Sequence, residues 1–184
     1  MNRINNNYSK FKLSKFHVSI FCCDRSESVN GTKLVEQIRS RFEHVYVQGF
    51  NTEAIFGLQH IVEALQITLE AYKRGTMVAN RPELDLLLRI SCTTQISKAI
   101  SHAGIKSGEI ACFVLFSKSR RDLLKARQYA RQSLSEFDCP EFVRDSSARN
   151  TLATKLGLET DSYFLQYDNE FLRYLIERAA LITR

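Results

Sequence analysis

Apolar residues recur at three- and four-residue steps through the middle of the chain, a period that predicts an amphipathic helix. The strongest such run comprises Ile55, Leu58, Ile61, Val62, Leu65, Leu69 and Tyr72. Asn51 or Thr52 can cap the start of this helix, and a basic last turn followed by Gly75 predicts its end. The pattern therefore predicts one long helix from about residue 52 to residue 75.

Shorter apolar runs predict further elements on both sides of this helix. The predicted strands span residues 16–23, 44–47, 109–116 and 139–143, and the other helices span 33–42, 117–134, 148–156 and 169–182. Strands separated by helices often form a parallel sheet, but strands so few and uneven leave the pairing open. The polar, Asn-rich segment 1–15 predicts a flexible basic leader, and residues 16–184 are expected to form a single domain.

Two short helices joined by a polar corner follow the long helix. Pro82 suits the first position of a helix, and Leu84, Leu87 and Leu88 then recur on one face. Thr93 can cap the second helix, and Gly104 can end it in the left-handed conformation. The apolar stripe of this second helix comprises Ile96, Ala99, Ile100 and Ala103.

These segments resemble the accessory subunits of the KEOPS complex that form the TPRKB, or PRPK-binding protein, family. Gly57–Gly75 corresponds to the family pattern GLxHIxxAxxxAxxAxxxG, Pro82–Ile105 to PELEILLxLSGTRQIxxAIxxxGI, and Ile176–Leu181 to IERxALL. Two positions depart from the pattern: Cys92 stands where the family has glycine, and Thr94 where it has arginine. The resemblance implies an α+β fold, a two-layer sandwich in which a small antiparallel or mixed sheet packs against several helices.

The resemblance also implies a function. It indicates a non-catalytic subunit without a cofactor, which binds the kinase-fold ATPase of KEOPS and the 3′ CCA end of tRNA and supports N6-threonylcarbamoyladenosine modification. The expected location is cytoplasmic, and also nuclear if the source is a eukaryote. Polar side chains at the corner are suited to an unpaired RNA end, because its bases offer hydrogen-bonding edges and its phosphates attract cations. The predicted contacts are Arg81, Arg89, Thr93, Thr94, Gln95 and Lys98. The alternative gives Thr93 only a capping role and Gln95 only a contact within the helix.

The charge of the chain is concentrated in one predicted helix. Lys and Arg total 26 against 20 for Asp and Glu, and the formal net charge is +6. Between residues 117 and 131, Asp122 alone opposes Lys118, Arg120, Arg121, Lys125, Arg127 and Arg131, an excess of +5 (six minus one). Arg121, Lys125 and Arg127 are therefore predicted to contact RNA phosphates.

The same basic helix also fits a different function. These cations can form the solvated side of a helix whose core side comprises Leu123, Leu124, Ala130 and Leu134. The chain is then a protein-only adaptor of the kinase subunit, without tRNA binding.

The last predicted helix carries more apolar residues than one narrow stripe can hold, namely Phe171, Leu172, Leu175, Ile176, Ala179, Leu181 and Ile182. Burial in the core and docking of a partner both fit this pattern. By resemblance the partner is the kinase, and the predicted contacts are Leu172, Leu175, Ile176 and Ala179.

Several other classes of function lack their sequence signals. The glycines form neither GxGxxG nor GxxxxGK[ST], and GxSxG and HExxH are absent. The five cysteines include no CxxC pair and predict neither a zinc site nor a disulfide framework. No apolar run reaches the roughly 18 residues of a membrane span, so a soluble protein is expected. The remaining catalytic hypothesis is a thiol or hydrolytic enzyme that uses Cys92 with His102.

Overall fold

The computed structural model describes residues 10–23, 31–106, 109–134, 136–137, 146–158 and 165–183. Contacts divide the chain into two compact units. The sheet unit comprises Met1–Gly49 and Ser107–Cys139, and the helical unit comprises Phe50–Lys106 and Pro140–Arg184. The expected α+β fold is confirmed, and the extent of a single domain over residues 16–184 stays a prediction.

The sheet unit is built around β2 (Phe16–Cys23), which pairs in antiparallel fashion with three other strands. These are β1 (Lys10–Leu13), β4 (Ala111–Ser117) and β5 (Glu136–Phe137), and the five-stranded sheet has the order β1-β2-β4-β3, where β3 is Tyr46–Asn51. Strands β2 and β4 are buried along almost their whole length.

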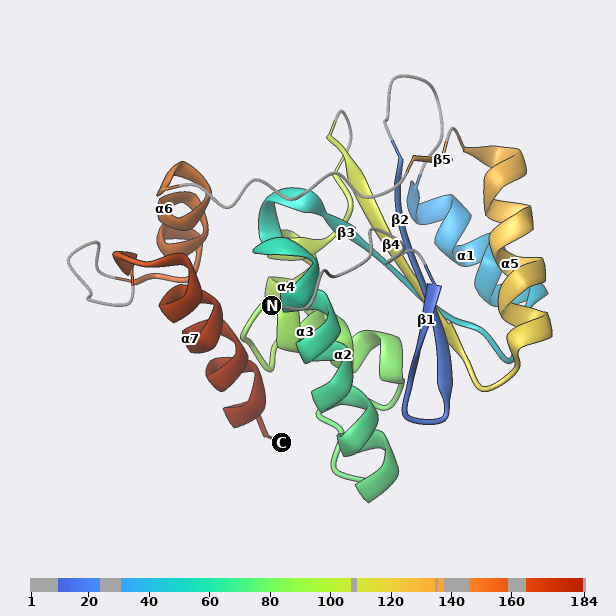
Figure 1. Ribbon diagram of the computed structural model, residues 1–184, viewed down its shortest axis with the longest axis horizontal. Helices are drawn as coiled ribbons and strands as arrows, with labels where there is room; N and C mark the ends of the chain where they lie inside the picture. Colours follow the sequence, from blue (N-terminus) through green and yellow to red (C-terminus); the bar gives the residue numbers. More distant parts are fainter. Residues whose placement is uncertain are drawn as a thin grey trace, which may run out of the picture. The chain divides into compact units, whose positions relative to one another are not determined.

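Two helices of the sheet unit, α1 (Gly31–Arg41) and α5 (Arg120–Ser133), lie together against the sheet (Figure 1). Ser119 caps α5, since its hydroxyl accepts a hydrogen bond from the Asp122 amide at 3.2 Å. Leu123 and Ala130 are buried as predicted, whereas Leu124 is 42% exposed. The prediction that Leu124 reaches the core is wrong, because this residue falls on the outer side of the helix.

The segment predicted as a flexible leader contains a strand. Lys10 and Lys12 are exposed in β1, whereas Phe11 and Leu13 are half-buried, which is the two-residue alternation of an edge strand. Pairing with β2 orders these four residues, so the leader prediction is wrong for them. Residues 1–9 and the strand predicted at 139–143 lie outside the described residues.

The helical unit begins with a short 3-10 helix rather than with the predicted long helix. Asn51 caps this 3-10 helix, η1 (Thr52–Ala54), because its side-chain oxygen accepts the Glu53 amide at 3.0 Å. The long helix α2 (Gly57–Arg74) starts only at Gly57, whose φ is +83°. The other helices of this unit are α3 (Pro82–Ile90), α4 (Ile96–Ala103), α6 (Ser146–Lys155) and α7 (Asp168–Leu181).

The core of the helical unit forms where α7 packs against α2 and α3 (Figure 1). Phe171 of α7 stands edge-on to Phe56, with ring centroids 4.9 Å apart. The surrounding buried cluster comprises Cys92, Leu152, Ala153, Leu165, Leu172 and Leu175. This packing fixes the end of α3, where the polar corner begins.

Candidate functional site

The polar corner starts where α3 stops, and Cys92 makes this stop. Cys92 has a φ of +47°; its N–H donates to the Arg89 carbonyl, and the N–H of Thr93 donates to the Leu88 carbonyl, both at 3.1 Å. This is the helix stop that usually has glycine in the left-handed position. Cys92 therefore takes a conformation that glycine adopts without penalty, at a strain of about 1–2 kcal/mol.

The side chain of Cys92 points into the helical core. Its Sγ atom is 3.8 Å from the Leu175 carbonyl oxygen of α7 and 3.6 Å from that of Arg89. Burial raises the pKa of the Cys92 thiol to about 11. The thiol is therefore protonated at neutral pH, which argues against the hypothesis that Cys92 is a nucleophile.

His102, the partner in that hypothesis, lies in the last turn of α4. Burial, together with the charges of Lys155 and Lys106, lowers its pKa below the usual value. Lys155 is itself paired with Glu53 at 2.7 Å. Burial and the two lysines therefore favour the neutral form of His102.

The corner itself lies on the surface. Thr94, Gln95 and Lys98 are exposed, and Gln95 is the residue before the first turn of α4. The Thr93 hydroxyl accepts the Gln95 N–H at 3.2 Å, so it closes a turn before the helix and does not cap the helix as predicted. The predicted corner residues Thr94, Gln95 and Lys98 thus share one accessible site.

Arg89 is not available to RNA, contrary to the prediction. It is 3% exposed, its Nε donates to Asp85 Oδ2 at 2.7 Å, and one terminal nitrogen donates to the Ala179 carbonyl at 2.7 Å. The other Asp85 oxygen accepts the Val78 N–H at 2.6 Å. Arg89 therefore fixes α7 to α3. Sequence reasoning missed this role, because nothing near Arg89 in the sequence indicates the distant Ala179 carbonyl.

Arg81 is exposed but distant from the corner. Its side chain is 53% exposed and pairs at 2.6 Å with Glu83, a buried residue. Arg81 precedes the first turn of α3 and the corner follows the last, so the nine residues of the helix separate them by about 13 Å. Arg81 and the corner thus lie at opposite ends of α3.

The apolar stripe of α4 is only half buried. Ala99 and Ala103 are fully buried, whereas Ile96 is 44% and Ile100 54% exposed. The two alanines let the helix approach α3 closely, and the larger isoleucines are left on one flank. The flank that these two isoleucines form is a feature that sequence reasoning missed.

Gly104 ends α4 for a different reason from the one predicted. Its φ of −64° and ψ of 156° are extended, not left-handed. A Cβ atom at this position would lie 2.4 Å from the Ile100 carbonyl oxygen. Gly104 is therefore required for space, because the chain passes close to the last turn of α4.

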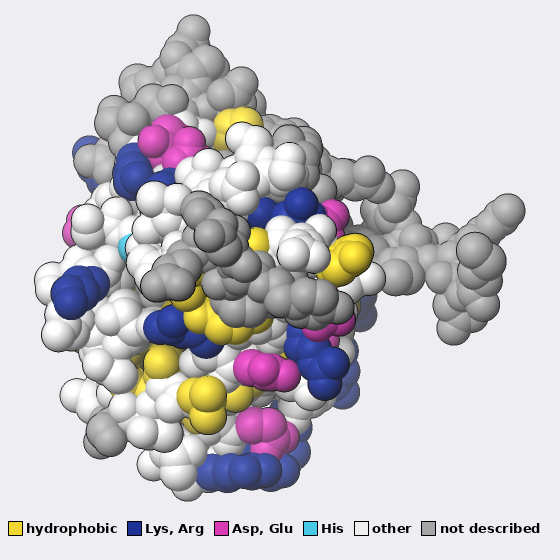
Figure 2. Space-filling model, turned by 90° about the vertical axis from the view of Figure 1, so that its left-hand side faces the viewer, with side chains coloured by type: hydrophobic (Ala, Val, Ile, Leu, Met, Phe, Trp, Pro, Cys, Tyr) yellow, Lys and Arg dark blue, Asp and Glu magenta, His cyan; other side chains and the backbone are white. Residues whose placement is uncertain are grey.

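The predicted kinase contacts on α7 belong to the core. Leu172, Leu175 and Ala179 are buried, and Ile176 packs partly buried against the same cluster. The exposed side of α7 carries an ion pair between Arg173 and Glu177 at 3.2 Å. Figure 2 views the side on which α6 and α7 lie in Figure 1, and charged groups there separate small apolar groups. Burial leaves Leu172, Leu175 and Ala179 little surface for a partner, and a kinase contact through the partly buried Ile176 stays a prediction.

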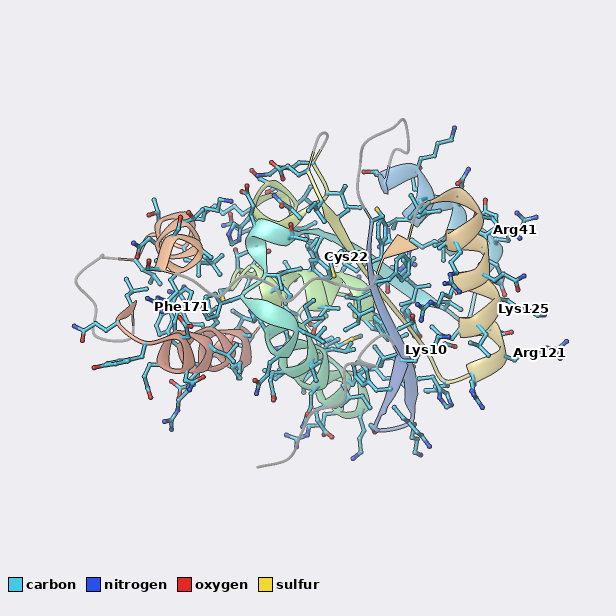
Figure 3. The ribbon with its side chains drawn as sticks, turned by 45° about the horizontal axis from the view of Figure 1, so that its top comes forward. Lys10, Cys22, Arg41, Arg121, Lys125 and Phe171 are labelled. Carbon is cyan, nitrogen blue, oxygen red and sulfur yellow. The ribbon has the colours of Figure 1, made fainter. Side chains whose placement is uncertain are left out.

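The basic helix α5 presents part of its charge outward. Arg121 and Lys125 are exposed one helical turn apart, and Figure 3 shows them on the side away from the sheet together with Arg41 of α1. Arg41, which sequence reasoning missed, lies 4.9 Å from the ring centre of Tyr129 on α5. Arg127 is buried, so its predicted contact with phosphates is withdrawn.

Two further classes of site find no support in the described part of the chain. Within it, no three His, Cys, Asp or Glu side chains are grouped so that they could hold a metal ion. None of the helices in the described ranges has the length and apolar character needed to cross a bilayer.

Comparison with known proteins adds one match. The family model described as kinase binding protein CGI-121 matches residues 26–142, which is more than half of the chain. The match includes the corner, α4 and α5, and it ends before α6 and α7. No curated protein matches the chain.

Proposed function

Because the chain belongs to the CGI-121 family of kinase binding proteins, we propose that it is a non-catalytic accessory subunit of the KEOPS complex. In this role it binds the kinase-fold ATPase of the complex and the 3′ CCA end of tRNA. It thereby holds the tRNA for N6-threonylcarbamoyladenosine modification, which other subunits carry out.

The observation that carries the RNA part is the exposed corner with Thr94, Gln95 and Lys98. The Gln95 amide has a donor and an acceptor for a base edge, and the Lys98 ammonium suits a phosphate. The hydrogen-bonded stop at Cys92 and the Thr93 turn fix the backbone that presents them. Such a preformed surface loses little entropy when a single-stranded end binds.

The exposed cations of α5 are proposed to contact the phosphate backbone of tRNA. Arg121 and Lys125 lie one turn apart on the exposed side of α5, and Asp122 is the only acidic residue in the sequence between residues 117 and 131. Binding through such contacts weakens as salt increases, because each neutralised phosphate releases counterions.

The test compares tRNA with and without its CCA end at one fixed salt concentration. We expect clearly tighter binding of the complete tRNA, and the Q95A/K98E variant should remove most of this difference. K12E is the matched control, because it reverses an exposed lysine on β1 and should preserve the preference for the CCA end. Equal affinities of the wild type for the two RNAs would remove the CCA role.

A protein-only adaptor is the second candidate, and three residues favour it. Thr94 replaces the arginine of the family pattern, and the buried Arg89 and Arg127 are withdrawn from the predicted RNA surface. Charge reversal at Arg121 and Lys125 separates the two functions. Unchanged RNA binding with intact kinase pull-down favours the adaptor, whereas weakened RNA binding with intact pull-down favours the RNA-binding subunit.

A further inference from the structure

Two exposed isoleucines form an apolar pair on α4. The large apolar side chains that are exposed within the described residues are Ile96, Ile100, Ile110, Leu124, Tyr167 and Leu181. Among these, Ile96 and Ile100 are four residues apart on one helix, so their side chains lie next to each other on one flank. Single exposed apolar residues are ordinary, but a pair on one flank presents a continuous apolar surface.

The packing of α4 does not require isoleucine at these positions. Ala99 and Ala103 already seat the helix, and both are fully buried. Ser97 and Ser101, the next residues around the helix, are exposed and polar. The exposed side of α4 thus accepts polar residues. The folding of this helix does not explain why isoleucine stands at positions 96 and 100.

The family match indicates which partner covers this flank. The description of the matched segment is kinase binding, and α4 lies inside it, whereas Tyr167 and Leu181 lie beyond residue 142. Ile110 and Leu124 belong to the sheet unit and lie on different elements, Ile110 before β4 and Leu124 on α5. Resting on the proposed function, we propose that the kinase-fold subunit docks on the flank of α4 formed by Ile96 and Ile100.

The polar side of α4 remains accessible when this flank is covered. Successive residues of a helix are about 100° apart, so Lys98 lies about 160° around the axis from both isoleucines. Lys98 is exposed, and Gln95 lies about 60° from it on the same side. The kinase and the RNA end therefore contact different sides of one short helix, and both bind at the same time.

The experiment measures the affinity of the full chain for the purified kinase-fold subunit of KEOPS from the same source. I96D/I100D places two charges on the apolar flank, and S97D/S101D is the matched control with the same charges, spacing and helix. Loss of a docking pair commonly weakens binding by about thirtyfold or more. We expect that loss for I96D/I100D and a change of less than about threefold for S97D/S101D.

A second variant distinguishes loss of the docking surface from loss of the fold, and failure of this proposal from failure of the proposed function. I96S/I100S removes the apolar surface without adding charge, and circular dichroism with thermal unfolding should show a native fold. It should weaken kinase binding and leave affinity for complete tRNA unchanged. Wild-type binding by a folded I96S/I100S variant would overturn the docking assignment while the proposed function stands. Absence of kinase binding by the wild type itself would overturn the proposed function.

Discussion

Helices α4 and α7 contrast in how they use their apolar residues. Helix α7 has the larger number, and it buries Phe171, Leu172, Leu175 and Ala179 against the helical core. Helix α4 is short, buries two alanines, and exposes two isoleucines. The comparison teaches that the helix with more apolar residues is the one that holds the unit together, and that the shorter helix is the one available to a partner.

The largest expected effect comes from Arg89, which pairs with Asp85 within α3 and donates a hydrogen bond to the Ala179 carbonyl of α7. R89A removes the contacts with Asp85 and with the Ala179 carbonyl, and leaves a buried carboxylate without its cation. We expect the free energy of unfolding to fall by about 3–5 kcal/mol in chemical denaturation. R173A breaks the exposed pair with Glu177 on α7 and should lower the free energy of unfolding by less than about 1 kcal/mol. Similar losses in the two variants would show that Arg89 does not anchor α7.

A pair of truncations compares the two helices directly. L175A opens a cavity beside Phe171 and should lower the free energy of unfolding by about 2–5 kcal/mol. I100A removes an exposed side chain from α4 and should change it by no more than about 0.5 kcal/mol. Urea denaturation monitored by circular dichroism gives both values. A large loss for I100A would mean that α4 needs its isoleucines for stability.

The buried thiol of Cys92, which lies between the end of α3 and α7, makes the stability of the fold depend on pH. Burial raises the pKa of Cys92 from 9.0 to about 11, so the folded state retains its proton where the unfolded state loses it. The contribution of the protonated thiol to the free energy of unfolding is complete below pH 9. It is lost as the pH rises to about 11, and the total loss is about 3 kcal/mol. The measurement is the free energy of unfolding of wild type and C92A across this range. The wild type should lose more stability than C92A, and parallel curves would contradict the raised pKa.

The smallest effect is expected for the substitution that restores the family residue. C92G relieves the strain of a left-handed side chain but removes the thiol from the contact with Leu175. These contributions oppose each other, so stability should change by about 1 kcal/mol or less in either direction. Binding of kinase and tRNA should be unchanged. Altered RNA affinity in this variant, measured at fixed salt, would show that Cys92 does more than end α3.

Local chemistry predicted a good part of the fold. Pro82 starts α3 and Gly75 ends α2, because both residues act through their own backbone. The predicted start of α2 was wrong, because Asn51 can cap either a 3-10 helix or an α-helix and the sequence does not distinguish the two. The buried state of Arg89 depends on a carbonyl 90 residues away, which no local pattern contains.

The candidate site was predicted only in part, for the same reason. The exposed corner follows from polar residues at a helix junction, and Gln95 and Lys98 lie there as expected. The period of apolar residues in α4 and α7 shows that each helix has an apolar side, but it does not show what covers that side. In α7 the cover is α2 and α3, whereas the Ile96 and Ile100 side chains of α4 remain exposed.

Amide hydrogen exchange tests the contrast between α4 and α7 most directly. The full chain is compared with and without the purified kinase-fold subunit of KEOPS, and exchange is followed in residues 96–103 and 168–181. The account predicts slower exchange in α4 on kinase binding and little change in α7. Slower exchange confined to α7, with α4 unaffected, would contradict it.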